Sequence, residues 1–223
     1  MLETSLSLAH LVHRGTAAGR PPIVILAHGY GSNEADLFGL APLLDPRVTL
    51  ICPRAPLVLG PGSFAWFDIG FTTRGIVADP AEVRHATGRM ARFVAEISAA
   101  WDVPASHVVI GGFSQGGTIA ALLLLTQPEQ VAGALILSGL LPDEALAEIP
   151  PHAALPTRRC FVSHGSADQV IPIAHGRGIP ARLAGLGVAA EYHEYPMGHT
   201  IDGACLGDMR RWLASWVDAL PTA

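Results

Sequence analysis

Residues 108–117 read VVIGGFSQGG and run directly into an apolar stretch at residues 118–125. The first three residues are β-branched and apolar, and the stretch after the glycines is apolar on every side. A continuous apolar run is typical of a strand that is covered on both faces. The segment therefore predicts a buried strand, a tight glycine turn and a buried helix at the centre of an α/β domain.

Within this segment, Gly112, Ser114 and Gly116 form the pattern G-x-S-x-G, which is typical of the nucleophile elbow of α/β-hydrolases. Such a turn would expose Ser114 at the N-terminus of the helix, where the N–H of Gln115 is free to bind a developing anion. The alternative is a glycine-rich turn whose serine only caps the helix. The strand before the turn and the buried helix after it favour the elbow, so we expect Ser114 to be a nucleophile.

Apolar strand patterns alternate with helical patterns along the rest of the chain. A helix is expected after Asp79, because an N-cap residue there is followed by Pro80 at the first helical position, and another is expected near the C-terminus. The alternation predicts a single α/β domain over residues 1–223, with a mostly parallel central sheet flanked by helices. The expected strands are residues 23–26, 48–52, 108–110, 134–137, 160–163 and 190–195, with an edge strand at 6–12.

Composition and missing motifs exclude several classes of protein. Half of the residues are hydrophobic and 15% are charged, which argues against disorder, and a net charge of −5 without a basic run argues against nucleic-acid binding. We find no signal-peptide pattern and no apolar stretch of about 20 residues, so we expect a cytoplasmic protein without stable membrane insertion. Nucleotide-binding and zinc-protease motifs are also missing, so we expect no cofactor and no metal.

An elbow serine needs a general base and an orienting acid, which follow it in the chain in the order Ser, Asp or Glu, His. His199 follows the last expected strand, and Asp168 follows the strand before it. Both would therefore lie at the carboxyl edge of the sheet, beside Ser114. We expect His199 to take the Ser114 proton and Asp168 to orient the imidazole.

Other residues remain open for these two roles. His164 and His193 are alternative bases, although both lie within expected strands, where core or surface packing is the simpler interpretation. Asp143 and Glu144 are alternative acids, because they follow an earlier strand at a position that some hydrolases use. We prefer His199 and Asp168.

Two further loops are candidates for binding substrate. The loop AHGYG at residues 27–31 is expected to supply a second oxyanion donor besides Gln115, namely the N–H of Tyr30 or, as the alternative, that of Gly31. The segment GSFAWFDIGF at residues 62–71 has no clear periodicity and suits the wall of an apolar pocket. We assign Trp66 and Phe67 to this wall, with simple core packing as the alternative.

Taken together, these motifs resemble the small phospholipase/carboxylesterase family of α/β-hydrolases, which includes the acyl-protein thioesterases. The resemblance covers roughly residues 20–217 and rests on several motifs in the family's order. These are HGYGSNE (28–34), PRAP (53–56), WFD (66–68), GFSQGG (112–117), LSG (137–139), HGSAD (164–168) and YHEYPMGH (192–199).

The resemblance implies a triad of Ser114, Asp168 and His199, with the amides of Tyr30 and Gln115 binding the oxyanion. It also implies a cofactor-free enzyme without a large lid domain that acts on short- to medium-chain esters, in a family whose members often form homodimers. We therefore expect a serine carboxylesterase acting on small-molecule esters through an acyl-enzyme. The alternatives are an acyl thioesterase or lysophospholipase with the same triad and, less favoured, a non-catalytic ligand-binding scaffold.

One departure from the family pattern bears on the fold. Pro180 lies in the segment that should form the helix after Asp168, together with Gly176 and Gly178. Because proline removes a helical hydrogen bond and crowds the preceding turn, we expect this helix to be kinked or shortened.

Overall fold

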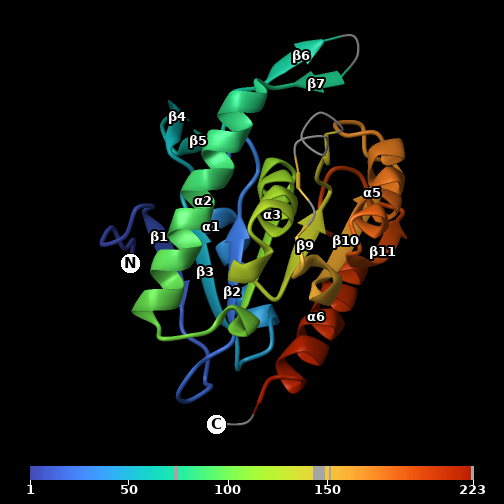
Figure 1. Ribbon diagram of the computed structural model, residues 1–223. Helices are drawn as coiled ribbons and strands as arrows, with labels where there is room; N and C mark the ends of the chain where they lie inside the picture. Colours follow the sequence, from blue (N-terminus) through green and yellow to red (C-terminus); the bar gives the residue numbers. More distant parts are fainter. Residues whose placement is uncertain (73–74, 143–148, 151, 222–223) are drawn as a thin grey trace.

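A seven-stranded sheet forms the centre of the computed structural model, which describes residues 1–72, 75–142, 149–150 and 152–221 (Figure 1). The strand order is β1-β3-β2-β8-β9-β10-β11. Only β1 runs antiparallel to its neighbour in this sheet, so the predicted mostly parallel α/β sheet is confirmed. The strands are β1 (His10–His13), β2 (Ile23–Ala27), β3 (Thr49–Pro53), β8 (Val108–Phe113), β9 (Gly133–Leu137), β10 (Arg159–Gly165) and β11 (Ala189–Tyr195).

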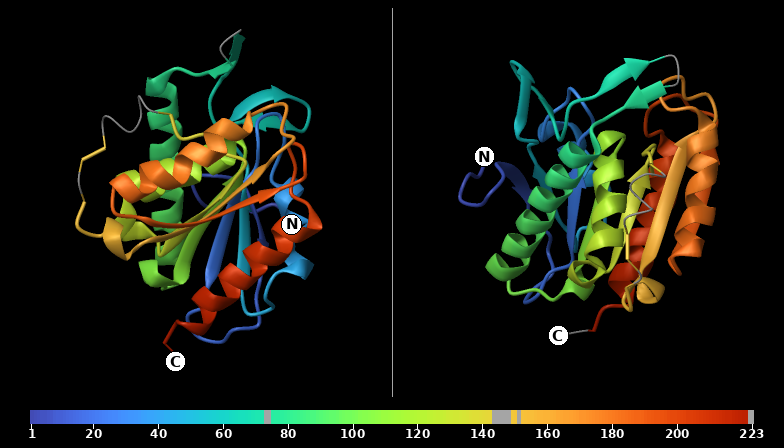
Figure 2. Two further views of the ribbon diagram at one scale, coloured as in Figure 1. Left: turned by 90° about the vertical axis from the view of Figure 1, so that its right-hand side faces the viewer. Right: turned by 45° about the horizontal axis from the view of Figure 1, so that its top comes forward.

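Helices cover both faces of the sheet, as continuous apolar strands require (Figure 2). Three of them, α2 (Pro80–Ala100), α3 (Gln115–Thr126) and α5 (Ile173–Gly185), pack into one core layer. The opposite layer contains α1 (Ala35–Phe38) and α6 (Gly203–Asp218). The predicted start of α2 is confirmed, because Asp79 Oδ1 accepts the N–H of Ala81 at 2.8 Å.

Two β-hairpins occupy the region that the sequence analysis treats as a loop. They are formed by β4 (Leu57–Gly60) with β5 (Ser63–Ala65), and by β6 (Gly70–Thr72) with β7 (Gly75–Val77). Each strand has only three or four residues and pairs outside the central sheet, so no alternating apolar pattern marks it. Both hairpins lie beyond the upper edge of the sheet in Figure 1, where the parallel strands end.

The helix after Asp168 is not shortened, so this part of the expectation was wrong. Helix α5 continues for 13 residues through Pro180. Proline removes a single backbone hydrogen bond, whereas Ile179 and Leu183 on the same helix are fully buried against the sheet. This packing holds the helix together on both sides of the proline.

The three cysteines, Cys52, Cys160 and Cys205, are free and buried. Burial raises the pKa of each thiol, which keeps all three protonated and unreactive. Among the described residues, no helix combines the length and apolar character needed to cross a membrane.

Candidate active site

Ser114 lies in a strained turn between β8 and α3. Its backbone has φ +55° and ψ −116°, a conformation that costs a non-glycine residue about 1–3 kcal/mol. The turn is held by the N–H of Ser114, which donates to Leu137 O at 2.8 Å on the adjacent strand. The turn also lies so close to β2 that a Cβ on Gly116 would be 2.0 Å from Ala27 O. The glycine in this position therefore permits the elbow that the sequence predicts.

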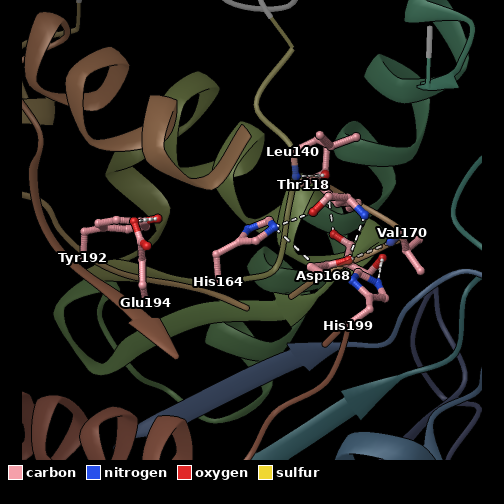
Figure 3. Close-up of polar contacts among 10 residues, drawn as sticks. Thr118, Leu140, His164, Asp168, Val170, Tyr192, Glu194 and His199 are labelled. Carbon is pink, nitrogen blue, oxygen red and sulfur yellow. Dashed lines mark hydrogen bonds and ion pairs between the residues drawn. The ribbon is translucent and has the colours of Figure 1, made fainter. Parts of the chain in front are cut away.

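A continuous hydrogen-bonded chain joins three loops at the carboxyl edge of the sheet. His199 Nε2 lies 2.9 Å from Ser114 Oγ, and His199 Nδ1 lies 2.7 Å from Asp168 Oδ2 (Figure 3). A carboxylate can only accept, so Nδ1 carries the proton, and Nε2 of the neutral ring is left to accept from the Ser114 hydroxyl. The structure thus brings together the three side chains that the sequence analysis selects.

Backbone amides orient the Asp168 carboxylate on its other side. Asp168 Oδ1 accepts the N–H groups of Val170 and Ile171, each at 2.8 Å, and the side chain is inaccessible to solvent. Burial alone would raise the pKa of Asp168, but the hydrogen bonds from His199 and from these amides outweigh burial and hold the pKa below its ordinary value. Asp168 is therefore ionised at neutral pH.

The alternative bases lie elsewhere. His164 is fully buried on the side of Asp168 away from His199, and its Nε2 donates to Ile171 O at 2.8 Å (Figure 3). His193 Nε2 pairs with Glu191 on β11 at 2.8 Å. Neither ring contacts Ser114, so the geometry favours His199 as the base. The alternative acids Asp143 and Glu144 lie outside the described residues.

Among the described residues, the N–H groups of Tyr30 and Gln115 have no hydrogen-bond partner. Both residues line the same cavity as Ser114. The alternative expectation, that Gly31 supplies this donor, was wrong, because the N–H of Gly31 already donates to Phe64 O at 2.9 Å. Pairing of this loop with β5 therefore engages the Gly31 amide and leaves the Tyr30 amide, together with that of Gln115, free to bind an oxyanion.

The side chain of Gln115 links the elbow to the aromatic segment, a contact that the sequence analysis missed. Its Oε1 accepts the N–H of Trp66 at 2.8 Å, and its Nε2 donates to Phe67 O at 2.8 Å. The partners are 48 and 49 residues away in the chain, and no local pattern marks such a contact. Gln115 thus holds one wall of the site against the nucleophile turn.

Replacing Gln115 with leucine is expected to destabilise the protein. The variant keeps the volume of the side chain but leaves a buried N–H and a buried C=O without partners, at a cost of about 1–3 kcal/mol each. Urea unfolding measures the loss. A free energy of unfolding within about 0.5 kcal/mol of wild type would show that water replaces both contacts.

An elongated cavity of about 590 Å³ opens beside Ser114 between α2 and α3. Ser114, Thr118, Leu122 and Thr126 line it at four-residue intervals along one face of α3, a distance of about 18 Å at the helical rise of roughly 1.5 Å per residue. Most of the remaining lining is apolar and includes Phe67. The cavity can hold an apolar chain whose reacting end lies at Ser114.

Only one of the two predicted wall residues lines this cavity. Both side chains pack into the main core, but Phe67 also lines the cavity, whereas Trp66 is 3% exposed and does not, so the expectation for Trp66 was wrong. Its indole Nε1 donates to His28 O at 2.9 Å, which satisfies its polar atom inside the protein. Trp66 therefore supports the loop that carries Tyr30 instead of contacting substrate.

Comparisons with known proteins find relatives over most of the chain. The chain is 30% identical to acyl-protein thioesterase 1 of Mycosarcoma maydis, covering 87% of this chain and 89% of that protein. It is also 30% identical to a probable inactive carboxylesterase of Oryza sativa subsp. japonica, covering 88% and 85%. Esterase PE8 superposes with a TM-score of 0.83 at 27% identity, covering 93% of this chain and 98% of that chain.

The fold is also shared with the carboxylesterase from Mesorhizobium loti, which has a TM-score of 0.83 at 23% identity and covers 96% of this chain and 98% of that chain. The model of the Phospholipase/Carboxylesterase family matches residues 15–217, nearly the whole chain. The family and its named relatives indicate a hydrolase of the esterase or thioesterase type. The protein belongs to the phospholipase/carboxylesterase family of α/β-hydrolases.

Proposed function

We propose that the protein is a serine carboxylesterase that cleaves esters through an acyl-enzyme on Ser114. The observation that carries this proposal is the unbroken hydrogen-bond chain from Asp168 through His199 to Ser114 at one end of an apolar cavity. A ligand-binding scaffold has no need of a strained serine whose hydroxyl faces a correctly oriented base.

In the proposed reaction, the Ser114 oxygen attacks the ester carbonyl while its proton passes to His199 Nε2. The carbonyl oxygen becomes an oxyanion and accepts hydrogen bonds from the N–H groups of Tyr30 and Gln115. As this intermediate collapses, the bond to the leaving alcohol breaks and His199 returns the proton to the alcohol oxygen. Water then attacks the acyl-enzyme with His199 again as the base, and the carboxylic acid leaves.

The length of the cavity indicates which acyl chains fit. A groove of about 18 Å along α3 is longer than a short acyl chain requires. Medium and longer acyl chains therefore fit, and a thioester of such a chain would react through the same residues. Acyl-protein thioesterase activity, which one relative carries in its name, is accordingly the second candidate.

A series of p-nitrophenyl esters from acetate to palmitate, with an acyl thioester of matched chain length, tests the proposal. We expect turnover of esters, with kcat/KM rising from acetate to a medium chain as the cavity is filled. A higher kcat/KM for the thioester at every length would favour the second candidate. Folded protein that hydrolyses none of these and does not react with a fluorophosphonate at Ser114 would contradict both.

The pH dependence of kcat/KM should reflect the ionisation of a single group, the general base. A histidine base must be neutral to accept the Ser114 proton, whereas Asp168 stays ionised in mild acid because its pKa is held below the ordinary value. We expect kcat/KM to fall steadily as the pH is lowered from about 8 to about 5, with one ionisation in the acid limb. A flat profile over this range would argue against a histidine base.

A further inference from the structure

His28 is a buried histidine whose ring is not part of the Ser114–His199–Asp168 chain. It follows β2 directly, at the start of the loop that carries Tyr30, and is only 1% exposed. Its ring has two backbone partners: Nδ1 lies 2.8 Å from Gly29 O, and Nε2 accepts the N–H of Ala55 at 3.1 Å. A buried ring with both nitrogens occupied by backbone groups is held in one orientation.

These two partners determine the tautomer of His28. The N–H of Ala55 can only donate, so Nε2 must carry the lone pair, and Nδ1 then carries the hydrogen and donates to Gly29 O. Burial lowers the pKa of His28, which keeps the ring neutral and this arrangement intact at neutral pH.

The bond to Gly29 O acts on the peptide that contains the N–H of Tyr30. A trans peptide is planar, with its C=O and N–H pointing in opposite directions. Because the Gly29 carbonyl points to the His28 ring, the N–H of Tyr30 must point away from it. This peptide is also next to the nucleophile, since a Cβ on Gly29 would lie 3.5 Å from Ser114 Cβ.

We propose that His28 is a positioning residue for the oxyanion hole, which fixes the Gly29–Tyr30 peptide through its Nδ1–H so that the Tyr30 amide faces the reacting carbonyl oxygen. This inference rests on the proposed function. His28 touches neither the substrate nor Ser114 and acts only through the peptide. Without this bond, the peptide can rotate, and the amide is lost to the transition state although the groove for substrate remains.

Two variants separate the Nδ1 bond from general packing. His28→Leu removes both ring nitrogens, whereas His28→Asn keeps an amide N–H close to the position of Nδ1 and can still donate to Gly29 O. His10→Leu is the matched control, because His10 is 2% exposed, its Nδ1 lies 2.9 Å from Leu8 O, and it lies on β1, away from the oxyanion loop.

Kinetics on a p-nitrophenyl ester provide the readout, with thermal unfolding measured in parallel. We expect His28→Leu to lower kcat about 10²-fold with KM changed less than about threefold, because an oxyanion contact is made in the transition state alone. His28→Asn should recover at least about a tenth of the wild-type kcat, and affinity for a boronic acid that mimics the tetrahedral intermediate should follow kcat across the series. His10→Leu should lose thermal stability but keep kcat.

Three outcomes would overturn the inference, and they differ from a failure of the proposed function. The first is a folded His28→Leu variant with wild-type kcat, and the second is an equal loss of kcat in His10→Leu. The third is a loss in His28→Leu that appears entirely in KM. If the wild-type protein itself neither hydrolyses the ester nor binds the boronic acid, the proposed function fails, and the inference fails with it.

Discussion

Ser114→Ala is expected to lower kcat for ester hydrolysis by about 10⁶-fold, which leaves only the rate enhancement that substrate binding and the oxyanion donors provide. The variant removes the attacking oxygen, and His199 at 2.9 Å from it then has no proton to accept. Alanine also has a Cβ, so the strain at φ +55° is unchanged and the fold should be retained. Turnover of a p-nitrophenyl ester, measured against the uncatalysed rate, gives the size of the effect.

Ser138→Ala is the matched control for this experiment. Ser138 also directly follows a parallel strand, has a positive φ of 48° and is buried, but its side chain takes no part in the hydrogen-bond chain to His199. We expect this variant to keep kcat within a few-fold of wild type. If Ser114→Ala retained more than about one hundredth of the activity, or if both variants lost it equally, Ser114 would not be the nucleophile.

The features that the sequence predicts well depend on local pattern or on a general rule of topology. The continuous apolar run before Ser114 and the glycines around it mark a strand and a tight turn within a few residues. His199 and Asp168 are far away in sequence, yet the rule that parallel strands end at one edge places both beside Ser114. Distances of 2.7 and 2.9 Å in the structure agree with this expectation.

The features that the sequence does not predict depend on contacts between distant segments of the chain. Trp66 and Phe67 are adjacent aromatics that both pack into the core, and only the fold decides that Phe67 also lines the cavity. The side chain of Gln115 fixes both of them, but nothing near Gln115 in the sequence indicates this. Likewise, Pro180 favours a shortened helix locally, and burial of Ile179 and Leu183 on the surrounding turns overrides that tendency.

Asp168→Asn is expected to lower kcat by about 10⁴-fold while the fold stays intact. The amide oxygen of asparagine can still accept the N–H groups of Val170 and Ile171, so the loop keeps its two backbone contacts. The amide nitrogen then faces His199 Nδ1 as a donor. This favours the tautomer with the proton on Nε2, which cannot accept a proton from Ser114. Single-turnover kinetics, in which acylation is followed directly, measure the effect.

Asp202→Asn distinguishes this loss from any general effect of replacing a carboxylate that accepts a backbone N–H. Asp202 caps α6 by accepting the N–H of Cys205 at 2.8 Å, and asparagine is as good an N-cap as aspartate. We expect this control to keep both stability and kcat. A kcat for Asp168→Asn within about tenfold of wild type would mean that the surrounding protein orients the His199 imidazole without the Asp168 carboxylate. Among the described residues no other carboxylate contacts His199 Nδ1, so such a result would also mean that the reaction needs no orienting acid.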